Sequence, residues 1–87
     1  MMANTAASWT LYELVDPISE CVRYVGITSF SIHKRLKEHL RESERYSIPK
    51  WRWIKRLRYL GLIPTIRIVH ENLTFEDVQK KEIDAIK

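Results

Sequence analysis

Two side chains that could act on a phosphate lie four residues apart in the middle of the sequence. Arg35 and His39 fall in a segment whose apolar residues Ile32, Leu36 and Leu40 recur at helical spacing. Residues at i and i+4 stack on one helical face, so both side chains are predicted to emerge at the edge of the apolar stripe. Arginine offers planar, bidentate donors that suit a phosphate. A phosphate site is one interpretation of this pair, and a structural ion pair or ordinary helix-surface positions is the other.

A carboxylate stands where an apolar side chain is expected near the end of the sequence. Glu82 falls near the middle of the apolar arc of a predicted helix, an arc defined by Phe75, Val78, Ala85 and Ile86. A carboxylate in such a place is costly unless it is paired, protonated or bound to a cation. Glu82 is therefore interpreted either as a cation ligand or as a side chain that is salt-bridged or reaches solvent.

Positive charge is concentrated in the middle of the chain. The sequence holds 15 Lys and Arg against 11 Asp and Glu, for a net charge of +4, whereas residues 31–60 alone hold ten basic and three acidic residues, for a net charge of +7. Trp51 and Trp53 lie in this basic segment. A basic segment with aromatic residues favours a polyanionic partner, nucleic acid first. A solvated helix surface is the alternative.

Composition excludes several other kinds of site. The single cysteine, Cys21, can form neither an internal disulfide nor a cysteine-based zinc site, and a reducing, cytoplasmic compartment is expected. Two glycines cannot build a glycine-rich phosphate loop. His33 and His39 are six residues apart and fall on different helical faces, which makes them a poor metal pair. No apolar stretch is long enough to span a bilayer, so no membrane association is expected.

The local patterns predict one α/β (α+β) domain over residues 1–87, with residues 1–8 as a loose tail. Strands are predicted over 9–15, 22–27 and 65–70. Helices are predicted to start at Ser29 or Ser31, to run from near Pro49 to Gly61, and to start at Thr74. The expected core face of the second helix is Trp53, Ile54, Leu57 and Leu60. The order β-β-α-α-β-α indicates a three-stranded antiparallel sheet flanked by three helices.

The first two strands each carry a tyrosine. Asp16 and Pro17 are turn residues, and a hairpin centred on Ile18 would set Tyr12 directly opposite Tyr24. Cross-strand partners project from the same face of a sheet. Both hydroxyls are therefore predicted to share one face, toward Arg35.

Taken together, these residues resemble the GIY-YIG nuclease superfamily, particularly the catalytic domains of phage and intron-encoded homing endonucleases. Its first motif corresponds here to Thr10-Leu11-Tyr12 and its second to Tyr24-Val25-Gly26. Residues 23–40 are similar to the family's second strand and following helix, with Arg35 and His39 in place. Residues 63–72 and 80–86 are similar to its third strand and to the helix with the metal-binding glutamate, here Glu82. The resemblance covers nearly the whole chain, although Thr10 and Leu11 replace a glycine and an isoleucine.

The resemblance implies a metal-dependent DNA endonuclease that hydrolyses phosphodiester bonds. It makes Glu82 the protein ligand of one divalent cation, Mg²⁺ or Mn²⁺, and gives Arg35 the scissile phosphate with help from His39. Tyr12 would be the general base, and Tyr24 would orient the water or stabilise the phosphate. Gly26 would let the backbone bend or a phosphate approach closely. The basic side chains expected to contact DNA are Lys34, Arg35, Lys37, Arg41, Lys55 and Arg56.

Two other functions stay open. A non-catalytic DNA-binding module on the same fold would use the basic helices and keep the site residues as relics. An interaction domain for another nuclease is the third possibility. The family often has an asparagine beyond the glutamate, and no asparagine follows Glu82. A protein partner or a further domain is expected to supply sequence specificity, because these 87 residues hold no separate DNA-binding domain.

Overall fold

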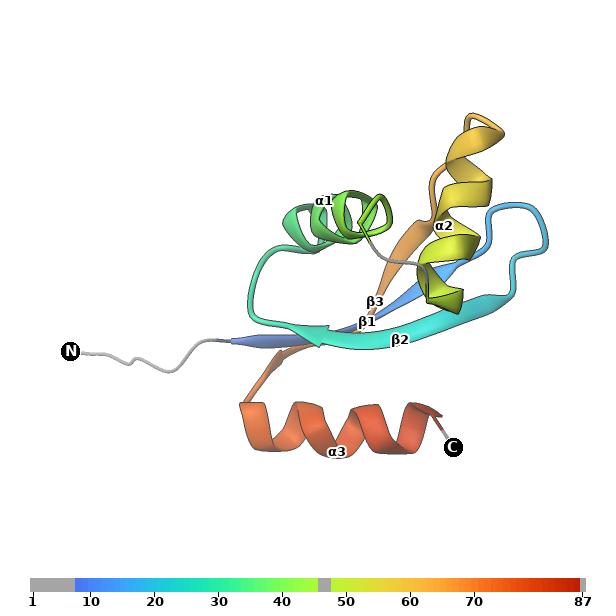
Figure 1. Cartoon of the computed structure of the whole chain (residues 1–87). Coiled ribbons are helices and arrows are strands. Elements are labelled where there is room, and N and C mark those ends of the chain that lie inside the picture. Colours follow the sequence, from blue (N-terminus) through green and yellow to red (C-terminus); the bar gives the residue numbers. More distant parts are fainter. Residues whose placement is uncertain (1–7, 46–47, 87) are drawn as a thin grey trace.

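A three-stranded antiparallel sheet, in the order β2-β1-β3, forms the centre of the molecule (Figure 1). The computed structural model describes residues 8–45 and 48–86. Its elements are β1 (Trp9–Val15), β2 (Val22–Thr28), α1 (Ile32–Glu42), α2 (Pro49–Tyr59), β3 (Thr65–Leu73) and α3 (Phe75–Ile86). The predicted α+β fold with the order β-β-α-α-β-α is confirmed.

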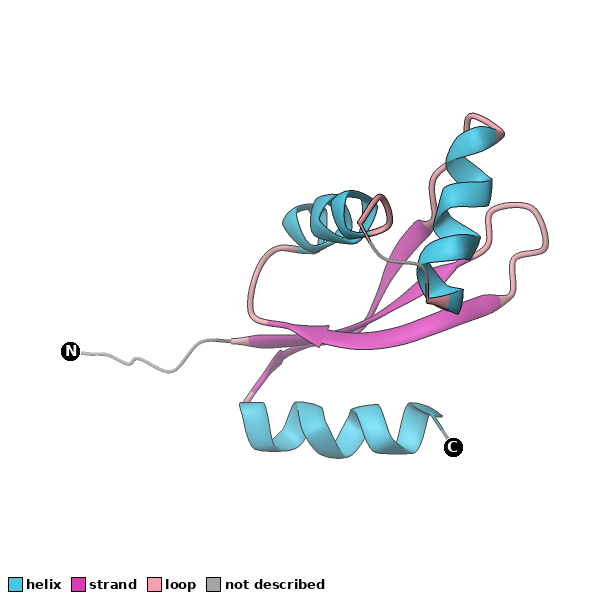
Figure 2. Ribbon diagram, in the orientation of Figure 1, coloured by secondary structure: helices cyan, strands magenta, loops and turns pink. Residues whose placement is uncertain are grey.

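The helices form two separate layers. Helices α1 and α2 cover one face of the sheet, and α3 covers the other (Figure 2). Alternation along β1 explains how both layers are held, since successive side chains of a strand point to opposite faces. Tyr12 and Leu14 pack into the core with α2, whereas Trp9 packs on Phe75 of α3 with 4.9 Å between ring centroids. Strand β1 therefore contributes side chains to both faces of the sheet. We call the side covered by α1 and α2 the upper layer and the side covered by α3 the lower layer (Figure 2).

The first turns of α1 and α3 are capped by a hydroxyl, and that of α2 begins with a proline. The Ser31 hydroxyl accepts from the Lys34 N–H at 3.2 Å, and the Thr74 hydroxyl accepts from the Asp77 N–H at 3.1 Å. Pro49 occupies the first turn of α2, where a missing N–H costs little. Gly61 follows α2 with φ of +79°, a conformation that favours glycine. These boundaries match the sequence predictions.

The main core lies between the sheet and α2. It contains Tyr12 and Leu14 together with Trp51, Trp53, Ile54 and Leu57, and the apolar stripe of α1 packs against it. Trp51 is buried, although the predicted core face of α2 omitted it, and Leu60, which was included, is 56 % exposed. Leu60 is the residue at which α2 ends. Its side chain therefore follows the last helical residue, Tyr59.

The hairpin register differs from the sequence prediction. Tyr12 pairs with Gly26, and Tyr24 pairs with Leu14, so the regular pairs are centred on Ser19 and not on Ile18. The turn is held by Asp16, whose Oδ1 accepts from the backbone N–H of Ile18 at 2.8 Å and of Ser19 at 3.2 Å. Tyr12 and Tyr24 still share one face, because Tyr24 is two residues from Gly26.

Two further observations concern the chain outside the core. No helix in residues 8–45 and 48–86 is long and apolar enough to cross a membrane. Of the tail expected over residues 1–8, only Ser8 lies within the described residues, and its hydroxyl bonds to the Asn72 amide oxygen at 3.3 Å.

Candidate functional site

Four side chains from three elements meet on the face of the sheet covered by α1 and α2. Tyr12 Oη lies 2.7 Å from Nε2 of His39 and accepts a hydrogen bond from Nε of Arg35 at 3.1 Å. The Tyr24 ring lies edge-on to His39, with 5.4 Å between centroids, and 6.3 Å from the Tyr12 ring. We call Tyr12, Tyr24, Arg35 and His39 the tyrosine–histidine cluster. The sequence predicted that Tyr12 and Tyr24 share a sheet face and that Arg35 and His39 share a helix face. In the structure these two pairs lie together.

The cluster has a defined direction of hydrogen bonding. A guanidinium can only donate, so the Tyr12 oxygen is the acceptor of the Arg35 bond. The hydroxyl proton of Tyr12 is then free to be donated to Nε2 of His39, which favours the tautomer with the histidine proton on Nδ1. Nδ1 is itself buried and has no hydrogen-bond partner among the residues described. Arg35, Tyr12 and His39 thus form one chain of donors and acceptors.

Burial sets the protonation of this chain. Burial, together with the positive charges of Arg35 and Lys50, lowers the pKa of His39 to about 3. Burial raises the pKa of the Tyr12 hydroxyl above its usual value, although Arg35 opposes that rise. Both side chains are completely shielded from solvent. At neutral pH this chain therefore consists of a neutral His39, a neutral Tyr12 and a charged Arg35.

The surroundings of Tyr12 disfavour its expected role as general base, which stays a prediction. Its hydroxyl is buried, stays protonated at neutral pH and is already bonded to two side chains. A general base must reach the proton that it removes, and water has no access to a fully buried oxygen. Tyr12 fits a positioning role, because it fixes the orientation of Arg35. Tyr24 is the partly exposed tyrosine of the cluster.

Gly26 is required by Tyr12, and not by a phosphate. A Cβ added at Gly26 would lie 2.6 Å from Oη and 2.8 Å from Cζ of Tyr12, and 2.8 Å from Cε2 of Tyr24. The rings of both tyrosines thus lie across the glycine on the sheet face. The predicted close approach at Gly26 exists, but aromatic side chains of the same chain occupy the space in which a phosphate was expected.

Arg35 also contacts two carboxylates of α1. Its Nη1 lies 3.1 Å from Glu38 Oε1 and 3.7 Å from Glu42 Oε1, and its side chain is 25 % exposed. Glu42 Oε1 is buried and has no hydrogen-bond partner among the described residues. The helical spacing that presents Arg35 to the sheet places both glutamates on the same side. An incoming phosphate would compete with these carboxylates for Arg35.

Lys50 belongs to the site and was missed by the sequence reasoning. Its Nζ lies 4.0 Å from the centroid of the Tyr24 ring and 3.8 Å from that of Trp51, in the range of cation–π contacts. Burial lowers the pKa of Lys50, and the charge of Arg35 lowers it further. The sequence did contain a signal for Lys50. Pro49 marks the start of α2, which places Lys50 in the first turn of that helix, next to the buried Trp51. Lys50 therefore adds a second positive charge to that of Arg35, and it lies over the Tyr24 ring.

Glu82 does not join the tyrosine–histidine cluster. It lies on α3, which packs on the opposite face of the sheet (Figure 1), and is partly exposed. No ion pair involves Glu82 within the described residues. Of the apolar arc around it, Val78 is buried, whereas Phe75 and Ile86 are 48 % and 66 % exposed. The resemblance assigns Glu82 to one active site with Tyr12, Tyr24 and Arg35, but α3 and α1 lie on opposite faces of the sheet (Figure 1).

The described residues around the tyrosine–histidine cluster do not fit a divalent cation, and the metal-binding role expected of Glu82 stays a prediction. They contain no group of three or more His, Cys, Asp and Glu side chains that could hold a metal. The carboxylates beside the cluster, Glu38 and Glu42, face Arg35, and Lys50 lies nearby, so two positive charges oppose a cation there. We therefore derive no chemical step through a metal at this site.

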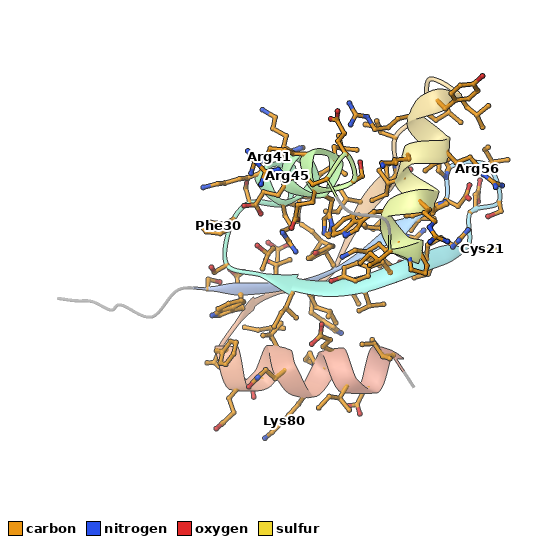
Figure 3. The ribbon with its side chains drawn as sticks, viewed as in Figure 1. Cys21, Phe30, Arg41, Arg45, Arg56 and Lys80 are labelled. Atoms are coloured by element: carbon orange, nitrogen blue, oxygen red, sulfur yellow. The ribbon has the colours of Figure 1, made fainter. Side chains whose placement is uncertain are left out.

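The basic side chains expected to bind DNA fall into two groups. Lys34, Lys37 and Arg41 are exposed on α1, and Lys55 and Arg56 are exposed on α2. Figure 3 shows Arg41 at α1 and Arg56 on the side of α2 that faces away from α1.

Comparison of the chain with protein-family models, with curated proteins and with solved structures finds no match.

Proposed function

We propose that this domain is a DNA endonuclease that hydrolyses phosphodiester bonds at the tyrosine–histidine cluster. One observation carries the proposal. Tyr12, Tyr24, Arg35 and His39, which the GIY-YIG resemblance marks as catalytic, come from three elements and meet in space, with the Tyr12 hydroxyl bonded to both Arg35 and His39. A core that only needed apolar packing would not place a buried Tyr–Arg–His chain at this position.

Arg35 and Lys50 are the groups proposed to hold the scissile phosphate. Hydrolysis builds up negative charge on the phosphoryl oxygens, and fixed positive donors in a partly water-excluded site stabilise that charge. Tyr12 orients Arg35 by accepting a hydrogen bond from its Nε. Nη1 of Arg35, which contacts Glu38 and Glu42, is then available to bind a phosphate in place of these carboxylates. Lys50 lies above Tyr24 and supports the same charge. His39 keeps Tyr12 in place from the buried side.

Tyr24 is the hydroxyl proposed to contact the reacting groups. It is partly exposed, lies next to the buried chain of Tyr12 and His39, and has the Lys50 ammonium over its ring. A phenol at this place can orient the attacking water or donate a hydrogen bond to a phosphoryl oxygen. Its role is therefore separable from that of Tyr12, which no solvent reaches.

Cleavage of supercoiled plasmid in Mg²⁺ or Mn²⁺, with an EDTA control, tests the proposal. We expect Tyr24→Phe to lower the cleavage rate by about 10²-fold or more, the usual range for a lost acid–base group. Tyr59→Phe is the matched control, because Tyr59 is 90 % exposed at the far end of α2. Equal rates for both variants, or no cleavage by the wild type in either metal, would contradict hydrolysis at this cluster.

A non-catalytic DNA-binding module is the second candidate, and a specific observation favours it. Tyr12 and His39 are fully buried, and Glu82 lies in the other layer, so the residues assigned to proton transfer and metal binding have no common access to a substrate. Such a module would bind duplex DNA through its basic helices. Binding without cleavage in the plasmid assay would support it.

A further inference from the structure

A pocket lined by three arginines lies between β2 and α2. Its walls are Arg23 of β2 and Pro49, Arg52, Trp53 and Arg56 of α2, and its volume is about 270 Å³. We call it the arginine pocket. Two of its residues are chain neighbours of residues at the cluster, because Arg23 precedes Tyr24 and Pro49 precedes Lys50, whose Nζ lies over the Tyr24 ring. A strand of nucleic acid that reaches Tyr24 and Lys50 would pass this pocket.

A bulge in β2 places Arg23 in the pocket. Leu14 pairs with Tyr24 and Val15 pairs with Val22, so Arg23 has no partner on β1. An extra residue of this kind interrupts alternation and redirects side chains. Arg23 would otherwise point to the face opposite Tyr24, yet its guanidinium carbon lies 5.1 Å from the centroid of the Trp53 ring on α2. The bulge therefore adds a third arginine to the two that α2 supplies.

Asp16 holds Trp53 and Arg23 in place and offsets part of the charge of Arg23 alone. Its Oδ2 accepts from Trp53 Nε1 at 3.0 Å and lies 3.9 Å from Nη1 of Arg23. The hydrogen bonds to Trp53 and to the turn lower the pKa of the Asp16 carboxyl, which stays ionised. The Asp16 oxygens accept hydrogen bonds from Trp53, Ile18 and Ser19. The interaction of Asp16 with the arginines of the pocket is the 3.9 Å contact with Arg23.

Arg52 and Arg56 have no carboxylate partner among the described residues. Arg58 pairs with Glu44 at 2.9 Å and Arg67 pairs with Glu13, whereas the exposed Arg41 and Arg45 of the α1 region, like Arg52 and Arg56, form no ion pair among the described residues. No acidic residue lines the arginine pocket, although the hairpin that supplies Arg23 also carries Glu20. Three guanidinium groups around one hollow repel each other, and an anion with several oxygen acceptors relieves that repulsion.

We propose that the arginine pocket binds a phosphate group of the DNA backbone next to the one at the tyrosine–histidine cluster. The proposal rests on the proposed function, because it takes DNA as the ligand. Planar guanidinium groups bind phosphate oxygens in pairs, and three of them can surround one phosphate. The contact is to the backbone, so it sets the position of the strand and carries no base preference.

Binding of a short duplex over a range of salt concentrations tests the arginine pocket. We expect Arg52→Gln with Arg56→Gln to weaken binding at low salt by about tenfold and to flatten the slope of log affinity against log salt by about 1, the value for one lost phosphate contact. The matched control is Lys80→Gln, because Lys80 is exposed on α3, on the far side of the molecule (Figure 3). The control is expected to leave both the affinity and the slope unchanged.

The outcomes separate this proposal from the function on which it rests. If the double variant binds DNA like Lys80→Gln, the arginine pocket is not a DNA site, whether or not the wild type cleaves. If the wild type binds without cleaving, hydrolysis fails while the pocket stands. Inorganic phosphate at constant ionic strength is the second arm: micromolar binding, seen as shifts of arginine side-chain NMR signals, would assign the pocket to a free anion and overturn the DNA assignment.

Discussion

At the scale of single residues, Gly26 and Tyr12 depend on each other. A Cβ at Gly26 would meet Tyr12 Oη at 2.6 Å and the two rings at 2.8 Å, distances that no real Cβ tolerates. Gly26→Ala must push Tyr12 away from His39 and Arg35, and we expect it to cost about 1–3 kcal/mol of stability, as overpacked cores do. Urea denaturation measures the change. Unaltered stability would show that the tyrosine rings do not lie across the glycine.

A second residue-scale prediction concerns His39 and pH. The pKa of His39 is about 3 in the folded protein, against an ordinary value of 6.5 in the unfolded chain. The unfolded state therefore binds more protons between these values, so this contribution to stability is complete above pH 6.5 and is lost as the pH falls toward 3. The slope from this group is at most about 1.4 kcal/mol per pH unit.

Unfolding free energies measured between pH 4.5 and 7.5 test this expectation with a matched pair of histidine variants. Replacing His39 by Gln removes the titrating group, so His39→Gln is expected to show a shallower dependence of stability on pH than the wild type. His33→Gln is the control, since His33 is on the same helix but is exposed. Equal slopes for the wild type and both variants would contradict a buried neutral His39.

At the scale of elements, the N-cap of α1 sets the orientation of the cluster. Ser31 accepts from the Lys34 N–H, and α1 then presents Arg35 and His39 to the sheet within its first two turns. Ser31→Ala is expected to cost about 1 kcal/mol of stability, the usual value of a lost cap. Ser29→Ala, at the other serine considered as a cap, is expected to cost less. Thermal melts compare the two, and a larger loss at Ser29 would contradict the assigned cap.

The elements also show what local patterns can predict. Caps, turns and helical stripes depend on neighbours in sequence, and Ser31, Pro49, Gly61 and Thr74 act where the sequence placed them. The hairpin register depends on how Asp16 closes the turn and on a bulge opposite Val15, which alternation alone does not reveal. The sequence therefore predicted the strands and the shared face of the tyrosines, but not their pairing partners.

At the scale of the whole molecule, the missing information is which face of the sheet each helix covers. Helical spacing showed that Glu82 interrupts an apolar arc, but an arc can pack on either face of a sheet. Arg35 and His39 could be placed with Tyr12 because α1 follows β2 directly. Helix α3 follows β3 at the other edge of β1, and its packing against Trp9 and Leu11 puts Glu82 in the lower layer.

The layered arrangement makes a final prediction about Glu82. It has no ion-pair partner in the described residues and is partly exposed, so Glu82→Ala removes no stabilising contact and replaces a glutamate by a better helix former. We expect its unfolding free energy to stay within about 0.5 kcal/mol of the wild type, the range for surface changes. Val78→Ala, one turn earlier and fully buried, is the contrasting variant and is expected to lose about 1–3 kcal/mol. If instead Glu82→Ala lost about 3–5 kcal/mol, the cost of breaking a buried ion pair, Glu82 would be a structural partner and its place in the lower layer would need revision.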